Sequence, residues 1–226
     1  MGASTVNKMP FQFYGAQKVK DPKALIGGKV AIAGVGSGSH FAAKLTLKYM
    51  GLNPDGDVTY IQMGSSPERF PALRLGQIQA TPLLPPDTLL AKKEKLPLLV
   101  DLSATNLDYI GTGFGTSQSF VKAHSEIVVN LLKAYCEGIA FSKSYRVESV
   151  QILLKYLKSS DVETVGDAYD LVVGKTIPQK PYPNWAGIKT VLESLSLKSY
   201  PAADAFINER FIRDLDSSGF IGRLYK

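Results

Sequence analysis

The sequence predicts an α/β protein with a mostly parallel sheet in its first half and helices in its second half. Short apolar runs alternate with amphipathic stretches from about residue 28 to 102, and the connections between them are short. This repeating pattern is typical of parallel strands covered by helices on both faces. From Tyr109 onward, helical periodicity dominates. A length of 226 residues, 45% of them hydrophobic, suits one large domain or two small lobes.

A glycine-rich stretch, residues 27–41, organises the first half. It predicts a buried strand ending at Ala33, then a turn with three glycines, then a helix that runs to about Met50 and stops at Gly51. Ser37 and Ser39 are candidate N-caps. A strand that feeds a helix N-terminus presents free N–H groups and the positive end of the helix dipole, so we expect a small anionic or polar ligand there.

Two other interpretations of this turn remain open. A dinucleotide-binding motif has the spacing G-x-G-x-x-G, whereas the glycines here are Gly34, Gly36 and Gly38, and no strand ending in an acidic residue follows. The glycines could also serve only to make a tight, serine-capped turn.

The remaining elements follow in order along the chain. Aromatic residues near alternation predict a strand within 8–20, and Asp21 with Pro22 predicts a short helical turn. Further strands are expected at 58–63, 80–84 and 96–102, with helices after Ser66 and from Asp87, each of which could act as an N-cap. Helices are then expected at about 118–143, 147–158, 161–174, 184–195 and 204–217, after a glycine-rich crossover at 111–117.

Three turns follow the carboxyl ends of the predicted parallel strands, and all are rich in glycine, serine or proline. Ligands bind outside this edge of such sheets. The predicted ligand-binding residues are Ser37, Gly38, Ser39, His40, Gly64, Ser65, Ser66, Pro85 and Pro86.

The sequence gives little support for catalysis. It has no H-E-x-x-H, C-x-x-C or G-x-S-x-G motif, and we expect no catalytic residues, no metal and no cofactor. The helix dipole should keep His40 neutral. Cys136, the single cysteine, lies in an amphipathic stretch and is expected to be a packed core thiol. The net charge is +6, but the lysines are scattered, so we expect no nucleic-acid partner.

No apolar run approaches the roughly 20 residues that span a bilayer, and the first residues lack the apolar core of a signal peptide. The start has the character of a cloning or truncation start, which leaves secretion open.

Several stretches resemble solute-binding proteins of ABC transporters, of the nitrate/sulfonate/taurine and thiamine-precursor (NMT1/THI5-like) type. They are residues 25–31, 36–80, 111–143 and 208–226, the last with the pattern Asn-x-Arg-Phe…Ser-Gly-Phe…Leu-Tyr. The resemblance implies a type II periplasmic-binding fold, with a small polar or anionic organic solute held between two α/β lobes. It also implies a periplasmic or extracytoplasmic location and delivery to a membrane permease.

The resemblance implies a complete second lobe at 28–112, with 1–27 and 113–226 forming the rest of the first lobe. Family members carry a further βαβαβ segment before the part matching Asn7, so we expect a truncated, helix-rich first lobe. The strand around Phe11 to Tyr14 would then be an exposed edge, which predicts a homodimer. The alternatives are a non-transport binding or sensory module, or an enzyme resembling the thiamine-pyrimidine synthases.

Overall fold

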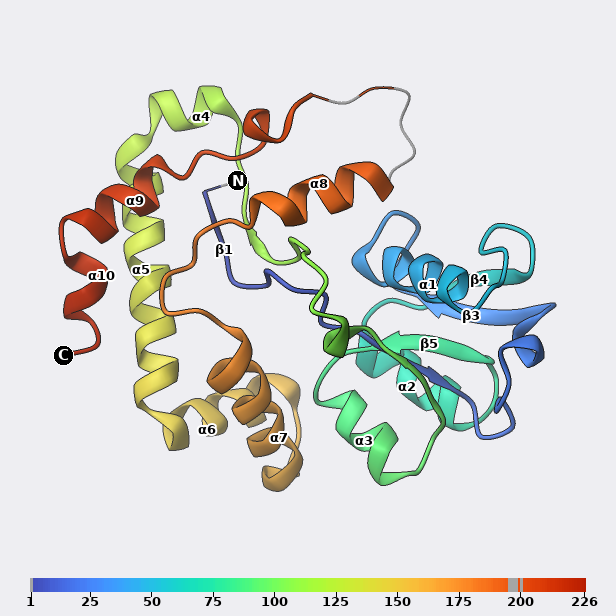
Figure 1. Cartoon of the computed structure of the whole chain (residues 1–226). Coiled ribbons are helices and arrows are strands. Elements are labelled where there is room, and N and C mark those ends of the chain that lie inside the picture. Colours follow the sequence, from blue (N-terminus) through green and yellow to red (C-terminus); the bar gives the residue numbers. More distant parts are fainter. Residues whose placement is uncertain (1, 195–198, 200) are drawn as a thin grey trace. The chain divides into compact units, whose positions relative to one another are not determined.

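The computed structural model describes residues 2–194, 199 and 201–226 and divides into two compact units. One unit comprises Met9–Leu107; the other comprises the residues up to Lys8 together with Asp108–Lys226. Figure 1 labels the elements of both.

The Met9–Leu107 unit is an α/β sandwich around one five-stranded sheet, in the order β4-β3-β5-β2-β6. Its strands are β2 (Gln12–Gly15), β3 (Gly28–Ile32), β4 (Val58–Gln62), β5 (Ala80–Leu83) and β6 (Leu98–Asp101). Its helices are the 3₁₀ turn η1 (Pro22–Leu25), α1 (Gly38–Tyr49), α2 (Ser66–Arg74), α3 (Asp87–Lys93) and the 3₁₀ turn η2 (Leu102–Thr105). Helix α1 lies on one face of the sheet, and α2 and α3 lie on the other (Figure 1).

The predicted order of strands and helices from β3 to β6 is confirmed to within a few residues, because each boundary carries a strong local signal. Gly51, for example, ends α1 with a φ of +79° that favours glycine. The sheet itself is mixed. Strands β3, β4 and β5 are parallel, whereas β2 is antiparallel to both β5 and β6.

The prediction that Phe11 to Tyr14 form an exposed edge is wrong. Strand β2 lies inside the sheet, with Phe13 paired to Pro82 on one side and Val100 on the other. The side chains of Phe11, Phe13 and Tyr14 are all buried. Residues 9–27, expected in the first lobe, therefore lie in the same compact unit as the parallel strands, and the predicted homodimer loses the edge on which it depended.

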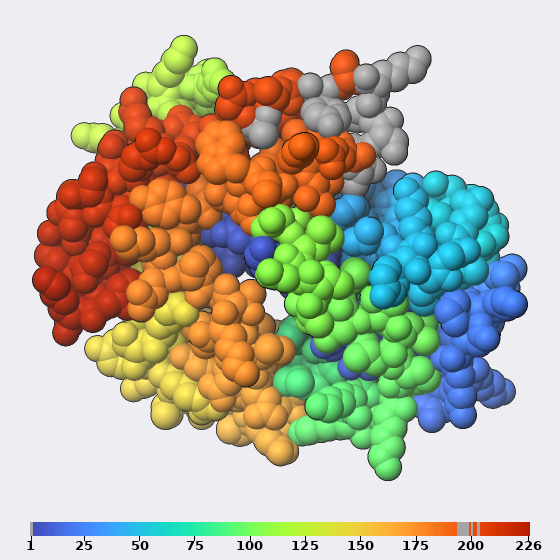
Figure 2. Space-filling model, viewed as in Figure 1, coloured from blue at the N-terminus to red at the C-terminus, as the bar shows by residue number. Residues whose placement is uncertain are grey.

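The second unit is mostly helical. It contains the short strands β1 (Ala3–Ser4) and β7 (Gly113–Phe114), which pair antiparallel. Its helices are α4 (Gln118–Ala123), α5 (Ser125–Ser144), α6 (Arg146–Leu157), α7 (Val162–Tyr169), the π-helix η3 (Asp170–Thr176), α8 (Trp185–Ser194), the 3₁₀ turn η4 (Ala203–Ala205), α9 (Arg210–Ser217) and α10 (Phe220–Arg223). Figure 2 shows the last residues, in red, forming one outer side of this unit.

Three predicted helices of this unit differ from the structure. The helix expected at 161–174 is α-helical only in α7 and continues as the π-helix η3. The helix expected at 118–143 is broken at His124, whose φ of −136° is not helical, so α4 and α5 are separate. The helix expected at 204–217 is α-helical only in α9. The helix expected at 184–195 matches α8, except that residue 195 lies outside the described residues.

Cys136 lies in the core of the helical unit, with Leu132, Phe211, Ile212 and Ile221. Burial, with Glu137 and Asp216 nearby, raises the pKa of its thiol to about 11. The prediction of a packed core thiol is confirmed.

Replacing Phe13 with alanine should lower the free energy of unfolding by about 3–5 kcal/mol, because a fully buried ring is removed from the centre of the sheet. Urea titration followed by circular dichroism measures the change. Tyr49→Ala is the control, since that ring is 78% exposed, and it should change stability by about 0.5 kcal/mol or less. Equal effects of the two variants would contradict the interior position of β2.

Candidate functional site

Three turns meet at the edge of the sheet where the parallel strands β3, β4 and β5 end, and they hold all nine predicted site residues. Hydrogen bonds link the first turn to the end of β4 and the second turn to the third. The N–H of Val35 donates to Oε1 of Gln62, at 3.4 Å, and the N–H of Leu84 donates to Oγ of Ser66, at 3.2 Å. The loops after β3 and β4 lead to helices on opposite faces of the sheet (Figure 1), the arrangement that opens a crevice between adjacent parallel strands.

The first turn is fixed by two serine hydroxyls. Ser37 caps α1 by accepting a hydrogen bond from the N–H of His40, at 3.2 Å. Ser39 is buried, and its Oγ accepts from the N–H of Ala33, at 2.8 Å, so it closes the turn rather than capping the helix. The N–H groups of Gly38 and Ser39 begin the helix and have no carbonyl one turn earlier to accept from them. They are the groups that a ligand could use.

His40 completes the first turn. Its Nδ1 accepts a hydrogen bond from the N–H of Gly36, at 3.0 Å, and its ring packs edge-on against Tyr60 with centroids 4.8 Å apart. Burial lowers the pKa of the imidazole, and Lys44 lowers it further, while Asp55 opposes them. The neutral ring therefore carries its proton on Nε2. The expected neutral histidine agrees with this direction, and burial is the largest cause of the lowered pKa.

The second turn begins α2 with Ser65, rather than Ser66, at the N-cap. The carboxylate of Glu68 accepts hydrogen bonds from both the N–H and the hydroxyl of Ser65, and these bonds lower its pKa. The buried hydroxyl of Ser66 faces the third turn instead. A negative charge therefore already occupies the N-terminus of α2.

The third turn contains a cis peptide bond between Pro85 and Pro86 and leads into α3. Asp87, expected as the N-cap, is instead the first residue of this helix, and Pro86 occupies the N-cap position. The Asp87 carboxyl group is buried, which raises its pKa, while Ser66 and Arg69 act in the opposite direction. Helix α3 thus also begins with an acidic side chain.

Sequence analysis missed Arg69, which joins the turn after β4 to strands β5 and β3. Its guanidinium donates to the carbonyl of Gly64 after β4, to the carbonyl of Pro82 in β5 at 3.0 Å, and to Oγ1 of Thr81 at 3.0 Å. Thr81 in turn donates to the carbonyl of Ala31 in β3, at 2.9 Å. Arg69 is 2% exposed. An arginine in a short polar helix is normally solvated, so the sequence carried no signal of this role.

Among the described residues, no group of three or more His, Cys, Asp or Glu side chains is placed to hold a metal ion. None of the helices described is both long and apolar enough to cross a bilayer.

A comparison with known proteins identifies the family and the fold. Residues 4–148 match the profile of the NMT1/THI5-like family, and the fold is that of periplasmic solute-binding proteins. The chain belongs to the NMT1/THI5-like family. No curated protein matches the sequence.

Three solved structures illustrate the similarity. The ligand-binding component of an ABC-type import system from Staphylococcus aureus has a TM-score of 0.68 and 16% identity, over 94% of this chain and 73% of that one. The periplasmic aliphatic sulphonate binding protein SsuA from Escherichia coli gives 0.60 and 19%, over 89% of this chain and 63% of that one. A mutant of DszB in complex with biphenyl-2-sulfinic acid gives 0.62 and 13%, over 96% of this chain and 78% of that one.

Replacing Arg69 with methionine should lower the free energy of unfolding by about 3–5 kcal/mol, because Asp87 loses its buried counter-charge and two carbonyls lose their donor. Urea titration measures the loss. Arg74→Met in the same helix is the control: that side chain is about half exposed and pairs with Glu94, so its removal should cost about 0.5 kcal/mol or less. A tolerated Arg69→Met would contradict the role of this residue.

The lowered pKa of His40 makes stability depend on pH. The unfolded chain, with an ordinary histidine pKa of about 6.5, binds the proton more tightly than the folded chain. Stability is therefore retained above pH ~6.5 and falls as the pH drops below it. When the pH is lowered from ~7.5 to ~5.5, across that pKa, the unfolding free energy of His40→Gln should fall by less than that of the parent protein. An NMR titration in which the His40 ring titrates at or above pH ~6.5 would refute this.

Proposed function

We propose that the chain is the solute-binding component of an ABC importer, located outside the cytoplasm, and that it passes a small organic anion to a membrane permease. Family membership supports a binding role, and the names of the S. aureus and E. coli neighbours point to import and to sulfonates. The proposed ligand-binding edge is the one formed by Ser37–His40, Gly64–Ser66 and Pro85–Pro86.

The observation that carries the proposal is a difference among the three helices that start at this edge. The first turn of α1 contains no acidic residue, whereas Glu68 lies in the first turn of α2 and Asp87 in that of α3. Helix α1 therefore has no carboxylate in its own first turn to balance the positive end of its dipole. The N–H groups of Gly38 and Ser39 are suited to the oxygens of a sulfonate or carboxylate.

A second candidate function is an enzyme, since the desulfurization enzyme DszB shares the fold. The described residues give this hypothesis little support. Cys136 is buried and its pKa is raised, so it is a poor nucleophile, and His40 uses Nδ1 in a structural hydrogen bond.

A sensory module that binds a solute without transport would use the same edge. We also propose that the Met9–Leu107 unit corresponds to the second lobe of the family.

A thermal-shift titration with butanesulfonate tests the proposal. A ligand that binds only the folded state stabilises it and so raises the melting temperature. At a ligand concentration of about 100 times Kd, the stabilisation is about 2.7 kcal/mol. The full chain should be stabilised by butanesulfonate and not by 1-butanol, which has the same alkyl chain without the anionic group. Native mass spectrometry should show one bound sulfonate per chain. Equal stabilisation by both compounds would contradict an anion site.

Ser65→Trp locates the site. Ser65 is exposed at the proposed edge, so a bulky ring there should block the ligand. Losing the N-cap of α2 should cost about 1 kcal/mol, which leaves the chain folded. Ser39 is buried and unsuitable for this test. Ala24→Trp is the matched control, exposed in η1 just before the amino end of β3. The butanesulfonate shift should vanish in Ser65→Trp and persist in Ala24→Trp. A shift that survives Ser65→Trp would exclude this edge.

A further inference from the structure

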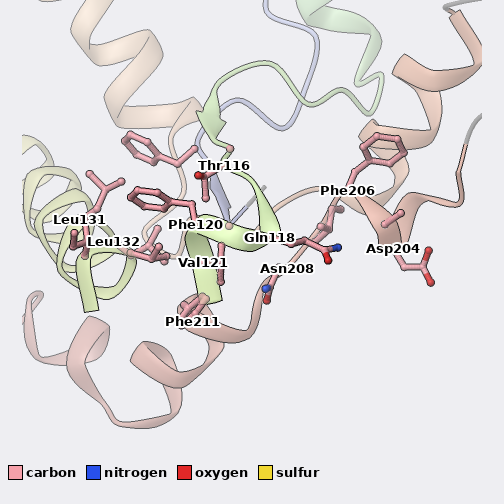
Figure 3. Close-up of a pocket in the computed structure, with 17 residues that line it drawn as sticks. Thr116, Gln118, Phe120, Val121, Leu131, Leu132, Asp204, Phe206, Asn208 and Phe211 are labelled. Carbon is pink, nitrogen blue, oxygen red and sulfur yellow. The ribbon is translucent and has the colours of Figure 1, made fainter. Parts of the chain in front are cut away.

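The helical unit contains a pocket of about 460 Å³, formed by α4, α5 and the segment that leads into α9 (Figure 3). Two of the residues that line it, Leu132 and Phe211, are part of the core of this unit and are almost fully buried. Phe114 lines one wall, and its ring packs edge-on against Tyr135 with centroids 4.5 Å apart. The pocket is therefore built on packed side chains, and all its lining residues belong to the helical unit.

One side of the pocket is apolar. Phe120 and Val121 come from α4, and Ile127 and Leu131 from α5; Figure 3 shows Phe120, Val121 and Leu131 on the same side as Leu132. Phe120, Ile127 and Leu131 each remain 40% or more exposed. Leaving such side chains in water is unfavourable, so an apolar molecule that covered them would gain binding free energy. The volume lies in the range of about 300–1,000 Å³ that is typical of small-molecule sites.

The other side offers a few polar groups. The carboxamide-bearing residues Gln118 and Asn208 both line the pocket (Figure 3). Oδ1 of Asn208 accepts a weak hydrogen bond from the N–H of Arg210, at 3.3 Å, which leaves its NH₂ group as a donor. These amides could orient one hydrogen-bonding group of a ligand.

The charge of its lining residues distinguishes this pocket from the proposed ligand-binding edge at α1. Of its 17 described lining residues, the only charged one is Asp204, and none is basic. A buried anion would lack a counter-charge here, whereas a neutral or cationic group would not be repelled by Asp204.

We propose that this pocket is a second binding site, for a small apolar molecule that is uncharged or cationic and carries one hydrogen-bonding group. The site does not depend on the proposed importer function, because it consists of other residues and disfavours the anions that the edge at α1 would bind.

N-phenyl-1-naphthylamine, an uncharged aromatic amine that fluoresces in apolar surroundings, is a suitable probe. Titrated into the full chain, it should bind saturably at one site per chain. Leu131→Gln should weaken binding at least tenfold. Ile152→Gln in α6 is the matched control: its side chain is 46% exposed, against 45% for Leu131, and does not line the pocket. It should leave the affinity unchanged.

Three results would overturn the proposal. They are no saturable binding, equal loss in the two variants, or binding that requires self-association of the chain through this pocket, as sedimentation velocity across a dilution series would reveal. Failure of the importer proposal would look different. Leu131→Gln should leave the butanesulfonate response unchanged, and Ser65→Trp should leave the probe affinity unchanged.

Discussion

The candidate site depends on one buried cation, the guanidinium of Arg69. Its hydrogen bonds reach the turn after β4 and the strand β5, and Thr81 extends the connection to β3. A buried arginine is unfavourable unless its donors are satisfied and an opposite charge is near; here two carbonyls, a hydroxyl and the Asp87 carboxyl group meet those needs. This one guanidinium therefore connects the turn after β4 with the strands β5 and β3. An edge that its own hydrogen bonds already hold in place would lose less entropy on binding a ligand.

The same network explains why the helix N-termini at this edge differ. Asp87 and Glu68 both offset the charge of Arg69, and both sit in the first turns of their helices. The acidic residues that stabilise the arginine therefore also neutralise two of the three helix dipoles. Helix α1 takes no part in that pairing, and its first turn keeps the N–H groups of Gly38 and Ser39 available to an anion.

The sequence predicted the strands and helices of the α/β unit well, because glycines, prolines and caps mark their ends. It also predicted which turns share an edge, since parallel strands must end together. It could not predict the position of β2: its aromatic pattern indicates a strand but not which neighbours it pairs with, and pairing across many residues is set by tertiary contacts. Arg69 was missed for a similar reason. Its burial follows from the fold and not from any local pattern around it.

An NMR titration of the ¹⁵N-labelled full chain with butanesulfonate tests the central claim most directly. The backbone amide signals of Gly38 and Ser39 should move saturably and more than any others in the Met9–Leu107 unit, because their N–H groups would bind the sulfonate oxygens. The amides at the start of α3, where Asp87 already supplies a negative charge, should change little. Changes centred on α3, or none at Gly38 and Ser39, would contradict the account.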